Sequence, residues 1–275
     1  MTDKQQLEDI EIRLFLEGVA EVWGYDFRNY APASLKRRIH KCLHDEGLKT
    51  IPDVQKKVLH EETAMKRLLN TLTISVTAMF RDPLFYLAFR QKVVPWLRTY
   101  PFIRIWVAGC ATGEEVYSIA ILLAEEGLNE RVKIYATDMN EDVLKSAKEG
   151  IYPLSLMKEY TTNYQKAGGI SSFSEYYTAK YDYAIFDKSL QKHIVWAHHN
   201  LVTDASFNDF NVILCRNVMI YFNQQLQRHV HDLLYNSLTH FGILCLGTKE
   251  SIMFTPHEEC YEAMDDRQKV WRKVK

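Results

Sequence analysis

The sequence predicts an α/β fold that follows an all-helical block and contains a small β insert. Residues 7–72 show only helical spacing of apolar residues, and no strand pattern appears before residue 100. From residue 103 onward, short apolar runs alternate with helical segments, which indicates a mostly parallel sheet. Residues 160–192 interrupt this alternation with Gly168-Gly169 and the aromatic run FSEYYTAKYDYAIF, which predicts short antiparallel strands within the α/β unit.

Glycine, proline and capping residues divide the helical block into predicted helices. Gly24 ends the first helix, Pro32 suits the first turn of the second, and Gly47 closes that helix. Thr50 begins a third helix, and leucines up to Leu72 line a fourth. The block is therefore expected to be a small helical domain.

The second of these helices contains a cluster of positive charge. Its basic residues are Lys36, Arg37, Arg38, His40 and Lys41. Arg37 and Lys41 are four residues apart in the sequence and share one face of a helix. Such a run can be a solvated helix face or a docking face for an acidic partner, and the residues alone leave both interpretations open.

Residues 73–82, TISVTAMFRD, form a predicted hinge after the helical block. Apolar residues in this segment alternate with the polar residues Thr73, Ser75, Thr77 and Arg81. One side of the segment can therefore pack while the other faces a cleft. Asp82 and Pro83 are suited to start a helix that runs to about Arg98, and Pro95 would kink or end it.

The α/β part is expected to contain the following elements. Its predicted strands are 103–108, 132–137, 193–199, 211–215, 243–247 and 269–274. Its predicted helices are 114–126, 141–149 and 224–241, each followed by a glycine: Gly127, Gly150 and Gly242. The expected organisation is a helical domain over 1–72, a linker over 73–90, and an α/β domain over 91–275 with the β insert at about 160–192.

The stretch WVAGCATGEEVYSIA at residues 106–120 reads as strand, loop and helix, an arrangement that can cradle a nucleotide-like ligand. Its small loop residues are Gly109, Ala111 and Gly113. A later apolar run ends at Asp138, whose carboxylate can accept both hydroxyls of a ribose. Glu114 and Glu115 disfavour a phosphate, so S-adenosylmethionine, which has a ribose and cationic groups but no phosphate, fits better than a dinucleotide. An ordinary βαβ turn with an unrelated surface acid remains the alternative.

Polar side chains also follow two later predicted strands. Arg216, Asn217 and Tyr221 come after strand 211–215, and Asn200 comes after strand 193–199. In an open α/β sheet, ligands bind beyond the carboxyl ends of the strands. Asn200 and Asn217 can each offer an amide to an adenine or to a ligand carboxylate. Tyr221 taken alone favours a place at the edge of the core over a functional role.

Composition argues against several classes of protein. The chain has 275 residues and a net charge of -1, which argues against a nucleic-acid binder. Its 5 cysteines are scattered without a CxxC pair, as in a cytosolic protein with reduced thiols, and its 10 histidines form no metal-binding pattern. No apolar run is long enough to span a bilayer, and the N-terminus has no signal-peptide core. A cytoplasmic protein without metal or membrane insertion is expected.

Together these motifs resemble the CheR family, the chemotaxis-receptor glutamate O-methyltransferases that use S-adenosylmethionine. The resemblance covers nearly the whole chain and rests on LKRRI at Leu35–Ile39, TISVTAMFRD, WVAGCATGEEVYSIA, ATDMNEDVLKSAKEGIY, HHNL, ILCRNVMIYF and LGTKES, in this order. It implies a Rossmann-like methyltransferase domain behind an N-terminal all-helical domain. It also implies methyl transfer to glutamate carboxylates of a chemoreceptor or receptor-like signalling protein, with S-adenosylhomocysteine as the product.

The resemblance also implies roles for individual residues. In the family, the cofactor site is lined by the residues that match Thr77, Arg81, Glu114, Asp138, Asn200, Leu201 and Asn217. Ser75, Gly109 and Arg216 join this predicted set through their places in the hinge, the loop and the strand end. The residues matching Arg81 and Tyr221 are proposed to act in catalysis. The basic helix, with Lys36, Arg37, Arg38 and Lys41, would dock the receptor. The β insert holds a receptor tail peptide in some members of the family, and here its strand edge can receive a peptide or serve packing alone.

The match departs from the family pattern at three positions. Ser75 replaces the usual Asn, Met79 replaces a Phe, and Val116 stands where Pro is frequent. Ser75 can still form a hydrogen bond, although its side chain is shorter. The alternative to an active enzyme is a cofactor-binding interaction module that has lost catalysis and serves in a signalling pathway, within chemotaxis or outside it.

Overall fold

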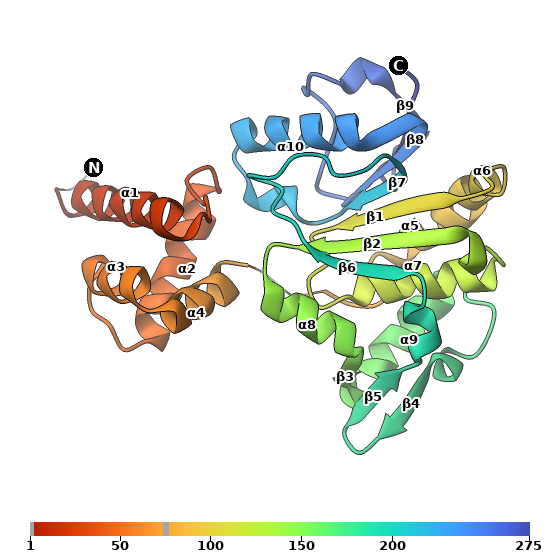
Figure 1. The fold of residues 1–275 in the computed structure, drawn as a ribbon, viewed down its shortest axis with the longest axis horizontal. Coiled ribbons are helices and arrows are strands. Elements are labelled where there is room, and N and C mark those ends of the chain that lie inside the picture. Colours follow the sequence, from red (N-terminus) through yellow and green to blue (C-terminus); the bar gives the residue numbers. More distant parts are fainter. Residues whose placement is uncertain (1–2, 74–76) are drawn as a thin grey trace. The chain divides into compact units, whose positions relative to one another are not determined.

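The computed structural model describes residues 3–73 and 77–275 of the chain (Figure 1). The chain divides into two compact units, which we name the helical unit and the sheet unit. The helical unit contains Met1–Ile74 and Tyr221–His229, and the sheet unit contains Ser75–Ile220 and Val230–Lys275. Ser75, which is predicted to bind the cofactor, lies outside the described residues.

The helical unit confirms the prediction that the first part of the chain is all helical. It contains α1 (Asp3–Trp23), α2 (Pro32–Asp45), α3 (Ile51–His60) and α4 (Glu62–Leu72). Thr50 caps α3 as expected: the N–H of Asp53 donates to its hydroxyl at 3.4 Å, and its own N–H donates to the Asp53 carboxylate at 3.0 Å. The core of the unit is formed by buried side chains that include Phe15, Val19, Ile39, Val54 and Leu68.

The sheet unit is built around a mostly parallel sheet, as predicted. Within the described residues its strand order is β6-β2-β1-β7-β8-β10-β9, and Figure 1 shows β6, β2, β1 and β7 side by side. The strands are β1 (Ile103–Ala108), β2 (Val132–Asp138), β6 (Ile194–His198), β7 (Phe210–Cys215), β8 (Leu238–Leu246), β9 (Tyr261–Asp265) and β10 (Val270–Lys273). The helices include α7 (Glu114–Glu125), α8 (Glu141–Glu149) and α10 (Gln224–Ser237), whose residues from Val230 onward belong to this unit.

Strand β9 was not predicted, because its residues lack a buried apolar side. Its residues are exposed or half-buried, and none of its side chains is fully buried. It pairs with β10 alone, at the edge of the sheet. A strand in this position needs few apolar residues, so hydrophobic periodicity gives little signal for it.

The predicted helix 224–241 is wrong at its end, and Gly242 does not terminate it. The helix stops at Ser237, and Gly242 lies inside β8. Leu238 pairs with Phe210 of β7, and the register of the two strands then shifts. A Cβ atom at position 242 would lie 2.9 Å from the Thr239 carbonyl oxygen and 3.1 Å from that of Phe210. Glycine is therefore required here for the close approach of the backbone in a strand irregularity.

The predicted helix from Pro83 to about Arg98 is helical throughout, but not uniformly α-helical. It consists of α5 (Pro83–Ala88), a π-helical turn at Phe89–Val93, and α6 (Val94–Leu97). Pro95 cannot donate to a carbonyl in the preceding turn, and a widened turn just before it accommodates this loss. The prediction that Asp82 caps α5 with its side chain is wrong. Its backbone is left-handed at φ 57, and its carboxylate pairs with Arg216 at 3.0 Å instead.

The β insert contains the predicted antiparallel strands but has different boundaries. Strands β3 (Ile151–Pro153), β5 (Tyr183–Phe186) and β4 (Tyr177–Lys180) form a small sheet in the order β3-β5-β4. The insert therefore begins before residue 160, and residues 160–166 belong to the helix α9 (Met157–Lys166). The helical spacing of its buried residues, Met157, Tyr160 and Tyr164, was hidden in an aromatic-rich segment.

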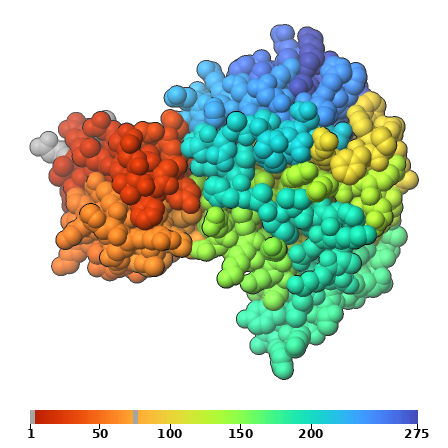
Figure 2. Space-filling model, in the orientation of Figure 1, coloured from red at the N-terminus to blue at the C-terminus, as the bar shows by residue number. Residues whose placement is uncertain are grey.

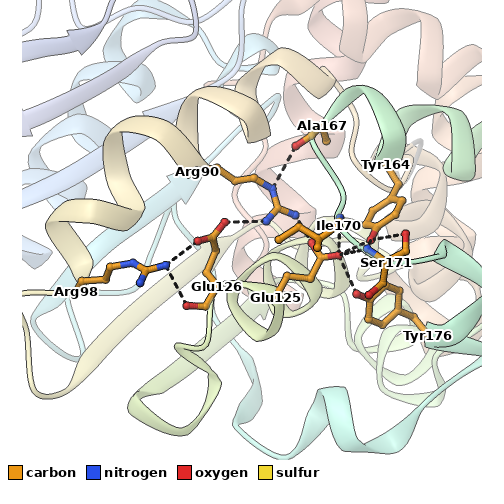
Figure 3. A network of polar contacts seen from close by, with 9 residues as sticks. All are labelled: Arg90, Arg98, Glu125, Glu126, Tyr164, Ala167, Ile170, Ser171 and Tyr176. Atoms are coloured by element: carbon orange, nitrogen blue, oxygen red, sulfur yellow. Dashed lines mark hydrogen bonds and ion pairs between the residues drawn. The ribbon is translucent and has the colours of Figure 1, made fainter.

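A buried polar network joins this insert to α7 and to the π-helical turn (Figure 3). The Glu125 carboxylate accepts hydrogen bonds from the hydroxyls of Tyr164 and Tyr176 and from the N–H groups of Ile170 at 3.0 Å and Ser171 at 3.3 Å. Arg90 pairs with the same carboxylate, and the two side chains are 7% and 4% exposed. Because both charges are buried and paired, the network fixes the insert to the sheet unit.

Candidate cofactor site

The loop after β1 has the tight backbone that the sequence predicts. Gly109, Ala111 and Gly113 all adopt positive φ angles, of 72°, 48° and 93°. A Cβ atom at position 109 would lie 2.6 Å from the Cγ2 atom of Val218, so this position requires glycine. The N–H groups of Gly109 and Cys110 both donate to the Thr137 carbonyl at 2.9 Å, which fixes the loop against the end of β2.

Asp138, the last residue of β2, faces this loop. Its Oδ2 atom accepts a hydrogen bond from the Ala111 N–H at 2.9 Å, and its Oδ1 atom accepts one from the Asn140 N–H at 3.0 Å. Burial raises the pKa of this carboxyl group, while these N–H donors favour the ionised form. Each carboxylate oxygen has a second acceptor position, so Asp138 can still accept the two hydroxyls of a ribose.

Glu114, the first residue of α7, is buried beside the same loop. Its carboxylate accepts hydrogen bonds from the Thr112 hydroxyl at 2.7 Å and the Tyr160 hydroxyl at 3.4 Å. Burial raises the pKa of this group as well. Tyr152 donates from its hydroxyl to the Thr112 carbonyl at 2.7 Å, so residues of the insert also hold the loop. A buried carboxylate here repels a phosphate and is matched to a cationic ligand group.

Two further residues that the sequence predicts to line the cofactor site follow β6. Asn200 and Leu201 are 3% and 7% exposed. The Asn200 side-chain oxygen accepts the Val202 N–H at 3.0 Å, and its own N–H donates to Asp204 at 2.8 Å, so the turn is well ordered by hydrogen bonds. Because β6 runs parallel to β2 and pairs with it, this turn lies at the same edge of the sheet as Asp138.

Arg216 and Asn217, at the end of β7, have different environments. The Arg216 guanidinium is buried, pairs with Glu115 at 2.6 Å and Asp82 at 3.0 Å, and lies 3.9 Å from the centre of the Phe85 ring. These contacts neutralise the positive charge of Arg216 within the protein. Asn217 is half-buried and left-handed at φ 61, a conformation that asparagine tolerates better than most residues.

One buried acid at this edge had no predicted role. Glu250, in the LGTKES motif, is 6% exposed and accepts hydrogen bonds from the N–H groups of Asn217 at 2.9 Å, Val218 at 2.9 Å and Met219 at 2.8 Å. The Gly247 N–H donates to it at 2.6 Å. A glycine followed three residues later by an acid at the end of a predicted strand is the sequence signal that could have drawn attention to it.

The described hinge residues from Thr77 onward belong to the sheet unit. Thr77 and Arg81 are half-buried, and the Arg81 N–H donates to the Ala78 carbonyl at 3.2 Å. The Phe80 N–H donates to the Ser118 hydroxyl at 2.8 Å, which fixes the segment against α7. The Asn163 amide of the insert donates to the Met79 carbonyl at 3.2 Å.

The remaining predicted residues belong to the helical unit. The Tyr221 carbonyl accepts the Ala31 N–H at 2.8 Å, and the Arg38 guanidinium lies 4.7 Å from the centre of the Tyr221 ring. Arg38 is buried at 6% exposure and donates to the Leu72 carbonyl, so it does not belong to an exposed docking face. Lys36 is half-buried and pairs with Glu8, whereas Arg37 and Lys41 are exposed.

The structure thus gathers Gly109, Glu114, Asp138, Asn200 and Asn217 at the carboxyl edge of β1, β2, β6 and β7. This edge offers a close-approach loop and two buried acids, Asp138 and Glu114, a set that fits S-adenosylmethionine. Residues 3–73 and 77–275 contain no group of His, Cys, Asp or Glu side chains that could hold a metal ion. None of the helices in the described part of the chain has both the length and the apolarity needed to cross a bilayer.

Comparison with known proteins identifies the family of the chain. The family model described as "CheR methyltransferase, SAM binding domain" matches residues 75–269, and that described as "CheR methyltransferase, all-alpha domain" matches residues 10–73. The chain is 50% identical over 265 residues to the putative methyltransferase Cher3 of Pseudomonas putida, covering 96% of this chain and 97% of that protein. It is 31% identical over 258 residues to the chemotaxis protein methyltransferase of Borreliella burgdorferi, covering 88% of each.

Among solved structures, the N-methyltransferase NodS from Bradyrhizobium japonicum aligns with 71% of this chain and 97% of its own, at a TM-score of 0.37 and 13% identity. The family matches together span the helical unit and the sheet unit. The chain therefore belongs to the CheR methyltransferase family and is an enzyme that uses S-adenosylmethionine as the methyl donor.

Proposed function

We propose that this enzyme methylates side-chain carboxylates of glutamate residues in a chemoreceptor or receptor-like signalling protein. The products are the glutamate methyl ester and S-adenosylhomocysteine. The observation that supports this function best is the alignment of the chain, over 88% of its length, with a chemotaxis protein methyltransferase. The acidic site around Glu114 and Asp138 suits the cationic cofactor that such a reaction uses. The retained Arg81 and Tyr221 favour an active enzyme over a silent cofactor-binding module.

The chemistry requires alignment more than acid–base catalysis. A glutamate side chain has an ordinary pKa near ~4.3 and is already an anion at neutral pH, so no general base is needed. A carboxylate oxygen attacks the methyl carbon, the carbon–sulfur bond breaks, and its electron pair returns to sulfur, which becomes a neutral thioether. Holding oxygen, carbon and sulfur in line can lower the barrier by up to roughly 7–11 kcal/mol.

The cofactor-binding roles are proposed from position and chemistry. Asp138 would accept the ribose hydroxyls, and the buried Glu114 would face positive charge on the cofactor. Asn200 and Asn217 would offer amides, and Leu201 an apolar contact. Ser75, Thr77, Arg81 and Gly109 complete the proposed set. Arg216 is left out of this set, because Glu115 and Asp82 already neutralise its charge.

Arg81 and Tyr221 are proposed to orient the substrate carboxylate. A guanidinium can bind a carboxylate through two parallel N–H···O bonds, and a phenol hydroxyl can donate one hydrogen bond to a carboxylate. The two residues belong to different units, Arg81 to the sheet unit and Tyr221 to the helical unit, and each role is proposed for the residue by itself.

The function is tested by transfer of tritiated methyl groups from labelled S-adenosylmethionine to a candidate receptor. Incorporated label that is released as volatile methanol by mild base is the expected result, because methyl esters are base-labile. Binding of the cofactor without any base-labile incorporation, across the receptors encoded in the same genome, would favour the silent interaction module instead.

The β insert has an exposed edge that suits a receptor tail peptide. Strand β4 is at the edge of the small sheet, and its residues from Thr178 to Lys180 are exposed. Figure 2 shows that the turn between β4 and β5 projects from the surface of the sheet unit. An exposed strand edge can pair with an extended peptide, so we propose that β4 receives the receptor tail.

Receptor docking is expected to depend on Arg37 and Lys41. Reversing both charges, Arg37→Glu with Lys41→Glu, should raise the KM for the receptor several-fold and leave cofactor affinity intact. Added salt should weaken the wild type in the same direction, since exposed charges are screened. The measurement is initial rate against receptor concentration at two ionic strengths.

The matched control is Lys56→Glu with Lys66→Glu, which makes the same change of net charge at exposed positions of α3 and α4. Lys66 pairs with Glu62 at i,i+4 spacing, as Lys41 does with Asp45. A receptor KM that changes equally in both double variants would show that Arg37 and Lys41 form a solvated helix face and not a docking face.

A further inference from the structure

The turn that follows β7 is fixed by the Glu250 carboxylate. Its Oε1 atom accepts the N–H groups of Val218 and Met219, and its Oε2 atom accepts those of Asn217 and Gly247. All of these donor–acceptor distances lie between 2.6 and 2.9 Å. Hydrogen bonds to an ionised acceptor are stronger than those between neutral groups, so one side chain determines the backbone path of three consecutive residues.

The fixed turn contains a strained residue and packs closely against a second loop. Asn217 has a left-handed backbone at φ 61, which costs free energy in a residue other than glycine. A Cβ atom at position 247 would lie 2.8 Å from the Asn217 nitrogen, the Asn217 side-chain amide and the Glu250 carboxylate. Gly247 is therefore required for the close approach of the two loops, and Glu250 holds Asn217 in its strained conformation.

The turn also touches the loop proposed to cradle the cofactor. The Val218 side chain occupies the space that a Cβ atom at position 109 would need, at 2.6 Å. Val218 thus connects Glu250 to the loop: its N–H donates to the Glu250 carboxylate, and its side chain contacts Gly109. Any shift of the turn would be transmitted directly to the loop after β1, because the contact leaves no free space.

We propose that Glu250 is a positioning residue for cofactor binding. By fixing the turn at residues 217–219, it presents the Asn217 amide and holds the Val218 side chain against the loop at Gly109. The proposal rests on the proposed roles of Gly109 and Asn217 as cofactor contacts. Glu250 itself touches the protein backbone and is not a catalytic residue. Its effect on cofactor affinity comes from the shape of the turn.

Glu125 provides the comparison that separates positioning from general stability (Figure 3). It is also a buried acid of the sheet unit with several donors: two N–H groups, two tyrosine hydroxyls and Arg90. Its partners belong to the insert and to the π-helical turn, and none is a proposed cofactor contact. Loss of either carboxylate should lower stability, but the loss of cofactor affinity should be much larger for Glu250, because Glu125 reaches the loop only indirectly, through the insert.

The test compares Glu250→Gln with Glu125→Gln in the full-length chain. Glutamine keeps the size of the side chain but can accept through one oxygen only, and its NH2 group would face two N–H donors. S-adenosylhomocysteine affinity is measured by calorimetry, and the unfolding temperature by circular dichroism. The expected result is a Kd raised ten-fold or more in Glu250→Gln and changed less than two-fold in Glu125→Gln.

Gly247→Ala is the second variant, for the case that Glu250→Gln does not fold. It keeps the carboxylate but pushes against Asn217, so it should also raise the Kd several-fold. An unchanged Kd in a folded Glu250→Gln or Gly247→Ala protein would overturn the proposal, as would an equal rise in Glu125→Gln. Because the readout is binding of the reaction product, a wild type that binds it but methylates no receptor would refute the proposed substrate and leave this test valid.

Discussion

Arg81→Lys is expected to lower turnover about a hundred-fold, which corresponds to roughly 2.7 kcal/mol of barrier. A guanidinium can hold a carboxylate through two parallel bonds, whereas an ammonium acts as a single point charge and cannot reproduce this geometry. The substrate carboxylate must lose water before it attacks the methyl group, and a fixed cation stabilises the anion without protonating it. Turnover should therefore fall while the positive charge is conserved.

The measurement is the single-turnover rate of methyl transfer at saturating cofactor, together with the Kd for S-adenosylhomocysteine. Arg81 is half-buried, so the fold should survive, and cofactor affinity should fall less than turnover. Arg98→Lys, an exposed arginine of the same unit that pairs with Glu126 at 2.9 Å, is the control. Normal turnover in Arg81→Lys would refute the orienting role, and equal losses of affinity and turnover would make Arg81 a cofactor ligand first.

Much of the fold could be predicted because its strands are apolar runs of ordinary length, separated by helices with clear ends. Gly150, for example, follows α8 in the left-handed conformation that a helix end favours, with φ 65. The errors occurred where pairing between distant residues decided the structure. Leu238 continues a helical pattern in sequence but pairs with Phe210 of β7, and that pairing ends the helix.

The site could be predicted only in part. Asp138 and Asn200 follow strands, and the carboxyl ends of parallel strands meet at one edge, so local sequence was sufficient to group them. Arg38 is different. It lies three residues after Leu35 and one before Ile39, both of which are buried. Helical spacing therefore places Arg38 on the apolar face, but the run of basic residues around it suggested an exposed face instead. The spacing of Gly247 and Glu250 could mark this acid, but not its role, because its partners at 217–219 are distant in sequence.

Asp138→Ala is expected to weaken cofactor binding ten-fold or more. If Asp138 binds the ribose as proposed, the change removes charge-assisted hydrogen bonds that are each worth roughly 1.5–3 kcal/mol, which corresponds to a factor of about ten to a hundred in Kd. It also leaves the N–H groups of Ala111 and Asn140 without their carboxylate acceptor. Ala111 has a left-handed backbone at φ 48, so the loop should lose order in the same variant.

Two further variants distinguish loss of the ribose contact from a general effect on the loop. Asp138→Asn keeps an acceptor for one N–H group and the size of the side chain, so it should preserve the fold and still raise the Kd for S-adenosylhomocysteine. Asp187→Ala removes an acid that accepts the Ser189 N–H at 2.8 Å in the insert, and should leave the Kd unchanged. Calorimetry with S-adenosylhomocysteine and with its 2′-deoxy analogue completes the test. If Asp138 binds the 2′-hydroxyl, the wild type should prefer the ribose form and Asp138→Asn should lose most of that preference. An undiminished preference in the folded variant would show that another residue binds the ribose.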